Sequence, residues 1–126
     1  MKLQILSDTH NSKYSISEQA DVIIHAGDFS NRVSGAIEFA EKCKSLNKKF
    51  IFVLGNHDYY SSNYSSVVNF LKENYPKNAL LDDNHIKIQD KIFVGGTLFT
   101  NFRSNSPLTS PEVLLQSQKD AEQSIY

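Results

Sequence analysis

Three apolar runs in the first half of the chain each end in side chains that can bind metal or transfer protons. Asp8 and His10 follow the first run, Gly27-Asp28 follows the second, and Gly55-Asn56-His57-Asp58 follows the third. Residues two apart in an extended or loop segment point to the same side, so Asp8 and His10 can bind one ion together. Three consecutive runs with such endings are far less probable as a coincidence than any one of them alone.

The residue types indicate metal-assisted chemistry at phosphorus. Asp28 adds a carboxylate whose two oxygens can bridge two cations, and Asn56 offers a neutral amide oxygen. Oxygen and imidazole ligands favour Mn²⁺, Fe or Zn²⁺ over a thiolate-preferring metal. Two such ions about 3.5–4 Å apart would stabilise both the attacking and the leaving oxygen of a phosphate displacement.

His57 directly follows Asn56, so the two side chains cannot easily share one ion. We expect His57 to face the substrate as a general acid that protonates the leaving oxygen. Asp58 would then hydrogen-bond the imidazole and stabilise its charged form.

Each of these residues also has an ordinary structural explanation. Asp, Asn and Gly are common turn residues, and Asp8 or Asp28 alone is typical of a turn or a helix cap. We expect His25, inside the second apolar run, to be a hydrogen-bonded core histidine, and His85 to lie on the surface. Cys43 belongs to the apolar stripe of a helix, where it is expected to pack in the core.

The elements that must position these side chains alternate along the chain. Strands are predicted at residues 2–7, 21–26 and 49–54, a helix after Ser30 or Asn31, a second helix between Ser61 or Ser62 and Pro76, and a hairpin at 85–96 that turns at Asp90-Lys91. This order predicts an α/β fold with a mostly parallel sheet, flanking helices and a C-terminal β-hairpin. Ligands bind such sheets at the carboxyl ends of the strands.

Composition narrows the function classes. The 126 residues suit one small domain, and a net charge of -1 leaves no basic surface for nucleic acid. One cysteine excludes an internal disulfide and suits a reducing compartment. No apolar run approaches the ~20 residues that span a bilayer, and no signal peptide is recognisable. We therefore expect a cytoplasmic protein with no membrane partner.

Taken together, Asp8-Thr9-His10, Gly27-Asp28 and Gly55-Asn56-His57-Asp58 resemble the signature of the calcineurin-like metallophosphoesterase superfamily. Gly95 to Phe102 is similar to a stretch in a bacterial and phage-type branch, so the resemblance covers residues 1–102. It implies a four-layer α/β/β/α sandwich with a dinuclear metal site. By this resemblance Asp8, His10 and Asp28 bind the first metal, Asp28 and Asn56 bind the second, a metal-bridging hydroxide attacks phosphorus, and His57 assists the leaving group.

The sequence departs from the family pattern after Phe102. Two further motifs of the family, a His-containing segment and Gly-His-x-His, supply ligands mostly to the second metal, and no histidine follows residue 85 here. We therefore expect a partial sandwich, a weakened second metal site, and an exposed sheet face that favours a homodimer or a complementing chain. Residues 103–126 are expected to form a polar tail, with a marginal helix or disorder, and Arg103 to lie in solvent.

The leading hypothesis is a metal-dependent phosphoesterase that hydrolyses a phosphomonoester or phosphodiester of unknown identity, in a form that the missing histidines can impair. One alternative is a non-catalytic metal- or phosphate-binding remnant or regulatory module. Another is one half of a split enzyme. No glycine-rich phosphate loop of the dinucleotide or Walker type occurs in the sequence.

Overall fold

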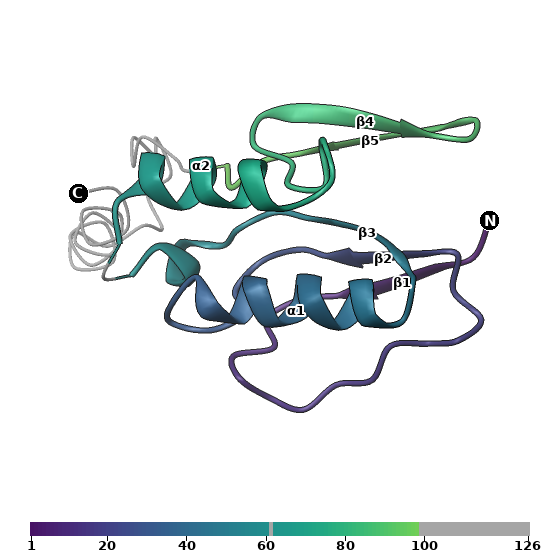
Figure 1. The fold of residues 1–126 in the computed structure, drawn as a ribbon, viewed down its shortest axis with the longest axis horizontal. Helices are drawn as coiled ribbons and strands as arrows, with labels where there is room; N and C mark the ends of the chain where they lie inside the picture. Colours follow the sequence, from purple (N-terminus) through teal and green to yellow (C-terminus); the bar gives the residue numbers. More distant parts are fainter. Residues whose placement is uncertain (61, 99–126) are drawn as a thin grey trace, which may run out of the picture.

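The computed structural model describes residues 1–60 and 62–98 (Figure 1). The predicted tail 103–126 and Arg103 lie outside these residues. Along the chain the elements are β1 (Leu3–Leu6), β2 (Val22–His25), α1 (Ser34–Ser45), β3 (Lys49–Phe52), the 3₁₀ turn η1 (Asn56–Tyr59), α2 (Tyr64–Asn74), β4 (Asn84–Ile88) and β5 (Lys91–Gly95). This mixture confirms the predicted α/β class and fits a partial sandwich.

Strands β1, β2 and β3 form a parallel sheet in that order. Leu3 pairs with Val22, and Ile24 pairs with Ile51, so the strands are in step. Because parallel strands in step end at the same edge, the three polar endings leave the sheet side by side. A parallel bridge between Phe52 and Leu80 extends the sheet beyond β3.

The two faces of this sheet are covered by different elements. On one face, Ile23, Phe50 and Phe52 pack with the buried residues of α1 and α2 in the larger core. On the other face, Val22 and Ile51 pack against Ile88 and Leu81, with the hairpin β4–β5 above them. In Figure 1 the sheet lies between α1 and the hairpin. Because successive side chains of a strand point to opposite faces, these four-residue strands contribute to a hydrophobic layer on each face of the sheet.

Helix boundaries differ from the sequence prediction for identifiable reasons. Helix α1 begins at Ser34, because the Ser30 hydroxyl is occupied in a local turn with the backbone of Arg32. Helix α2 is capped by Asn63, whose side chain accepts the Ser66 N–H at 3.2 Å, rather than by Ser61 or Ser62. It ends at Asn74, since Tyr75 precedes proline and is extended.

The hairpin also turns one residue earlier than predicted. Ile88 pairs with Lys91, which leaves Gln89 and Asp90 as the two turn residues. Gln89 has a φ of 55°, the left-handed geometry that tight hairpin turns require. The predicted turn at Asp90-Lys91 is therefore wrong by one position.

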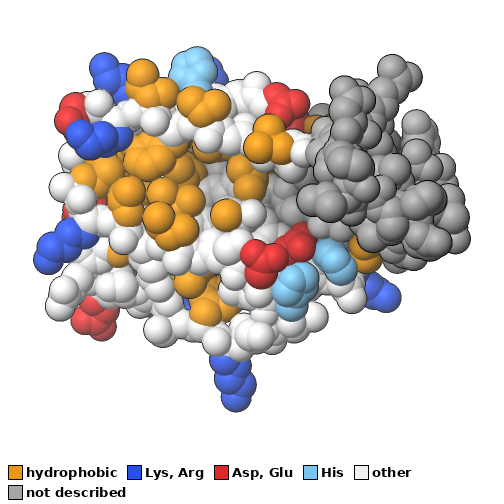
Figure 2. All heavy atoms as spheres, turned by 180° about the vertical axis from the view of Figure 1, so that it is seen from behind, with side chains coloured by type: hydrophobic (Ala, Val, Ile, Leu, Met, Phe, Trp, Pro, Cys, Tyr) orange, Lys and Arg blue, Asp and Glu red, His pale blue; other side chains and the backbone are white. Residues whose placement is uncertain are grey.

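The hairpin leaves part of its face of the sheet uncovered. Leu3 and Ile5 of β1, Ile92 and Val94 of β5, and Leu98 after β5 are exposed by 42% to 81%. We call these five residues the apolar patch. Figure 2 shows one face of the molecule on which hydrophobic side chains gather. A cleft of about 870 Å³ beside Ile24 and Val53 opens onto the patch. Within residues 1–60 and 62–98, no helix is long and apolar enough to cross a membrane.

Candidate metal centre

The loops that leave β1 and β2 are joined by a short ladder of backbone hydrogen bonds. Asp8 N–H donates to the Gly27 carbonyl at 3.0 Å, His10 N–H to Asp28 at 3.2 Å, and Asn11 N–H to Phe29 at 2.9 Å. The ladder continues the pairing of the parallel strands past their ends. It places the Asp8–His10 segment directly against Asp28.

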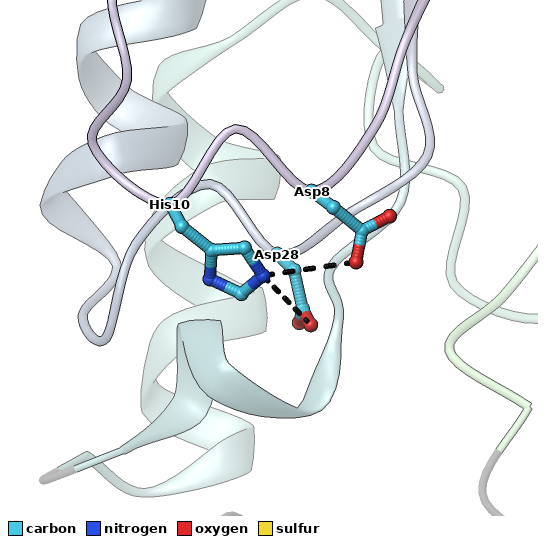
Figure 3. Close-up of side chains that lie close together, drawn as sticks. All are labelled: Asp8, His10 and Asp28. Atoms are coloured by element: carbon cyan, nitrogen blue, oxygen red, sulfur yellow. Dashed lines mark ion pairs between the residues drawn. The ribbon is translucent and has the colours of Figure 1, made fainter.

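Three predicted ligands meet at this ladder. Ligand atoms of Asp8, His10 and Asp28 all lie within 4.8 Å of one another. His10 Nε2 is 3.7 Å from Asp8 Oδ1 and 3.8 Å from Asp28 Oδ2, and Figure 3 shows the three side chains pointing toward one point. Both distances are too long for hydrogen bonds.

The donor set fits a divalent cation. Atoms that share one ion through bonds of about 2.0–2.2 Å can lie up to about 4.4 Å apart, and both His10 distances fall within that limit. Two carboxylates beside an imidazole also concentrate negative charge that a cation would neutralise. Carboxylate oxygen and imidazole nitrogen suit Mn²⁺, Fe and Zn²⁺.

Left-handed backbone, rather than an extended segment, brings the ligands together. Asp8, His10 and Asp28 have φ values of 48°, 42° and 57°. Such conformations cost non-glycine residues of order 1–3 kcal/mol each and persist only where the surroundings enforce them. The predicted convergence of Asp8 and His10 in an extended or loop segment is present, but left-handed loop backbone produces it rather than the two-residue repeat of a strand.

Glycine at position 55 lets the third strand ending approach the first two. A Cβ on Gly55 would lie 1.9 Å from Asp28 Oδ1, so any side chain there would displace the carboxylate. Gly27 has a φ of 96°, and its missing Cβ would meet Gly55 N at 2.6 Å. The two glycines therefore allow backbone and carboxylate to pack in direct contact.

The turn η1 brings Asn56 and His57 to this contact. His57 N–H donates to Asp28 Oδ1 at 3.2 Å, so the backbone after Asn56 is tied to the carboxylate expected to bridge two ions. Asn56 opens η1 one residue before this bond. Its place beside Asp28 is compatible with the predicted ligand role.

Asp58 has a different role from the one predicted. Its carboxylate is fully buried and accepts four backbone N–H groups: Gly55 at 2.9 Å, Asp28 at 2.8 Å, Phe29 at 2.9 Å and Ser30 at 3.2 Å. Burial raises the pKa of Asp58 to about 6, although these donors favour the charged form. The predicted hydrogen bond from Asp58 to the His57 imidazole is therefore wrong, because both carboxylate oxygens face the loop backbone.

His57 is held instead by Asn31, a residue that sequence reasoning treated only as a helix cap. His57 Nδ1 lies 2.8 Å from Asn31 Oδ1. With the amide oxygen as acceptor, Nδ1 carries a proton and Nε2 is left for the substrate. The His57 ring also meets the His10 ring edge-on at 5.2 Å, which places it beside the ligands. The available signal was a polar residue three positions after Asp28 in a strand-end loop.

The structure confirms the predictions for three further residues, His25, Cys43 and His85. His25 is fully buried with both ring nitrogens bonded, Cys43 is fully buried on α1, and His85 is exposed on β4. Burial raises the pKa of the Cys43 thiol to about 12, which leaves it protonated and unsuited to bind metal.

A family model of the calcineurin-like phosphoesterases matches residues 1–124. The chain belongs to this family. Among curated proteins, an uncharacterized protein of Acanthamoeba polyphaga mimivirus is 30% identical over 84 residues, which cover 60% of this chain and 30% of that protein. The alignment with this relative thus spans well under half of its length. No solved structure matches the chain.

Family membership and geometry agree on the same centre. The phosphoesterase family uses divalent metal, and the one cluster of potential ligands found among the described residues is Asp8, His10 and Asp28. These are the residues that the sequence motif assigns to the first metal.

Proposed function

We propose that this phosphoesterase binds a divalent cation through Asp8, His10 and Asp28 and hydrolyses a phosphomonoester or phosphodiester. The observation that carries the proposal is the convergence of the three ligand atoms within 4.8 Å at the ends of two parallel strands. Mn²⁺ is the proposed ion, with Fe or Zn²⁺ as alternatives, because the donors are oxygen and imidazole nitrogen.

A bound cation would polarise the phosphoryl oxygen and make a water nucleophilic near neutral pH. The residues of the chain supply the rest of the reaction. Among the described residues, Asp28 and Asn56 are the two ligands proposed for a second ion, so we propose that this second site binds weakly. His57, oriented through Nδ1 by Asn31, presents Nε2 on the substrate side.

We propose that His57 acts as the general acid. In its protonated form, Nε2–H gives its proton to the leaving oxygen as the ester P–O bond breaks and the water oxygen bonds to phosphorus. Asp58 contributes by holding the backbone of Asp28 and Gly55 rather than by touching the imidazole. We therefore propose a supporting role for Asp58 and a catalytic role for His57.

A second candidate is a split or complemented enzyme. The exposure of the apolar patch supports a form in which another chain, or a second copy of this one, covers the sheet face. A non-catalytic metal or phosphate binder is the remaining alternative.

Turnover assays distinguish these candidates. Hydrolysis of bis-p-nitrophenyl phosphate and p-nitrophenyl phosphate is measured with Mn²⁺ and after chelation, for wild type, Asp8→Ala, His57→Ala and the control His85→Ala. The control alters a histidine on the exposed face of β4. Mn²⁺-dependent turnover that is lost in Asp8→Ala, reduced in His57→Ala and kept in His85→Ala supports the enzyme. Mn²⁺ binding without turnover supports the binder.

A further inference from the structure

His25 is the last residue of β2, next to the two loops that carry the ligands. The side chain is fully buried, and the ring of Phe29 stacks on it at 3.6 Å with an interplanar angle of 19°. The Phe39 ring contacts it edge-on at 5.3 Å. Phe29 is the residue after Asp28, so the imidazole is packed directly against the Asp28 loop.

Both nitrogens of His25 are hydrogen-bonded, and the partners determine the tautomer. Gly27 N–H lies 3.1 Å from Nδ1, and since a backbone N–H can only donate, Nδ1 is unprotonated. Nε2 then carries the proton and donates to Thr9 Oγ1 at 3.1 Å. The Thr9 hydroxyl in turn donates to the Phe29 carbonyl at 3.4 Å. Burial lowers the pKa of His25 to about 4, which keeps this arrangement neutral.

These contacts flank every ligand of the proposed first metal. Thr9 lies between Asp8 and His10, and Gly27 and Phe29 lie on either side of Asp28. We propose that His25 is a positioning residue for the metal centre, a buried imidazole that holds the Asp8–His10 segment against the Asp28 loop. The inference rests on the proposed metal function of this cluster.

The ligand geometry requires such support. All three ligand residues have left-handed backbone, which an isolated loop would abandon. The backbone ladder fixes the spacing of the two loops. The hydrogen bond between His25 and Thr9 adds a second connection between the same parts of the chain. Removing the imidazole therefore loosens the approach of two carboxylates that repel each other.

Calorimetric titration with Mn²⁺ tests the proposal, together with amide hydrogen exchange of the metal-free protein. His25→Leu removes both hydrogen bonds, whereas His25→Gln can restore the donor to Thr9. Thr9→Val keeps the imidazole and removes its partner, so it serves if His25→Leu does not fold. Leu71→Ala is the matched control, because Leu71 is fully buried in α2 and its truncation destabilises the core without touching these loops.

We expect His25→Leu and Thr9→Val to raise the Mn²⁺ Kd by about tenfold or more, His25→Gln to recover part of the affinity, and Leu71→Ala to stay close to wild type. The amides of Asp8, His10 and Asn11 should lose protection in His25→Leu but not in Leu71→Ala. Unchanged affinity in folded Thr9→Val, or equal weakening in Leu71→Ala, would overturn the proposal.

A wild-type protein that binds no Mn²⁺ would refute the metal function itself, and the exchange data then decide the inference alone. Selective loss of protection at the Asp8 and His10 amides upholds the tie between the loops. Uniform protection across wild type, Thr9→Val and Leu71→Ala refutes it.

Discussion

The buried carboxylate of Asp58 accepts the backbone N–H of Asp28 at 2.8 Å, so one acidic residue holds another in the candidate metal centre. The same oxygen accepts Gly55 N–H at 2.9 Å. Asp58 thereby fixes the distance between the second and third strand endings. Asp58 thus sets the relative position of Asp28 and His57, because the His57 backbone is bonded to Asp28 in turn.

Replacing Asp58 with Asn should destabilise the fold. The amide retains one acceptor oxygen and directs an NH₂ group toward backbone donors, which leaves buried N–H groups unsatisfied. We expect a loss of about 2–4 kcal/mol in the free energy of unfolding, measured by urea denaturation. Asp90→Asn, at an exposed turn, is the control and should be nearly neutral. Equal stability of the two variants would contradict the role of Asp58 as the acceptor of these backbone N–H groups.

Replacing Gly55 with Ala should weaken metal binding. The new methyl group would occupy the space of Asp28 Oδ1, which lies 1.9 Å from the Cβ position, so the carboxylate must move. We expect the Mn²⁺ Kd to rise by about tenfold or more in calorimetric titration of folded protein. Ser12→Ala, in the loop after the ligands, is the control. Wild-type affinity in Gly55→Ala would show that Asp28 is not a ligand.

Replacing Asn31 with Ala should affect substrates according to their leaving groups. Without the amide oxygen, His57 is free to rotate, and general acid catalysis contributes most when the leaving oxygen is strongly basic. We expect turnover of an alkyl phosphoester to fall by about tenfold or more, and turnover of a nitrophenyl ester to fall far less. Asn74→Ala, at the exposed end of α2, is the control. An equal loss on both substrates would argue against the orienting role of Asn31.

The His25 imidazole should titrate only in acid. Burial lowers its pKa from 6.5 to about 4, with Asp8 acting in the opposite direction and the rings of Tyr14, Phe29 and Phe39 packed around it. The unfolded chain binds this proton first, so folding stability contributed by neutral His25 is complete above pH 6.5 and is lost as pH falls toward 4. The loss is on the order of 3 kcal/mol, at 1.36 kcal/mol per pKa unit.

The titration of Asp58 changes folding stability in the opposite direction over nearly the same pH range. Its pKa is raised to about 6, so the folded state binds that proton first and loses stability as pH rises from about 4 to 6. Denaturation of the wild type alone would therefore show a small net slope. NMR titration of the His25 ring isolates the histidine, with His85 as an exposed reference in the same spectra. A His25 midpoint near 6.5 would contradict the prediction.

The apolar patch should make the protein self-associate. We propose a homodimer through this patch, because its five large apolar side chains are exposed and favour burial against a partner. Sedimentation velocity across the micromolar range should show a concentration-dependent dimer for wild type and a monomer for Val94→Lys. Lys87→Glu, an exposed change on the neighbouring strand β4, is the control. A wild-type monomer at all concentrations would leave a complementing chain as the partner to seek.

The sequence by itself determined the α/β order and the residues that gather at one edge of the sheet. Apolar periodicity marks the strands and helices. Parallel strands in step end at the same edge of the sheet, so Asp8, Asp28 and Asn56, which follow them, lie side by side. Glycine at 27 and 55 was visible as part of the motif. None of this requires knowledge of how individual side chains pack.

Only the tertiary structure decided which groups contact one another. Asp58 follows His57 in the chain, yet it turns inward to the Asp28 loop, and His57 is held by Asn31 from the preceding crossover. Periodicity reports which face a residue occupies in a regular element, whereas these residues lie in irregular loops with left-handed backbone. Their partners depend on the packing of loops distant in sequence, which a one-dimensional pattern does not contain.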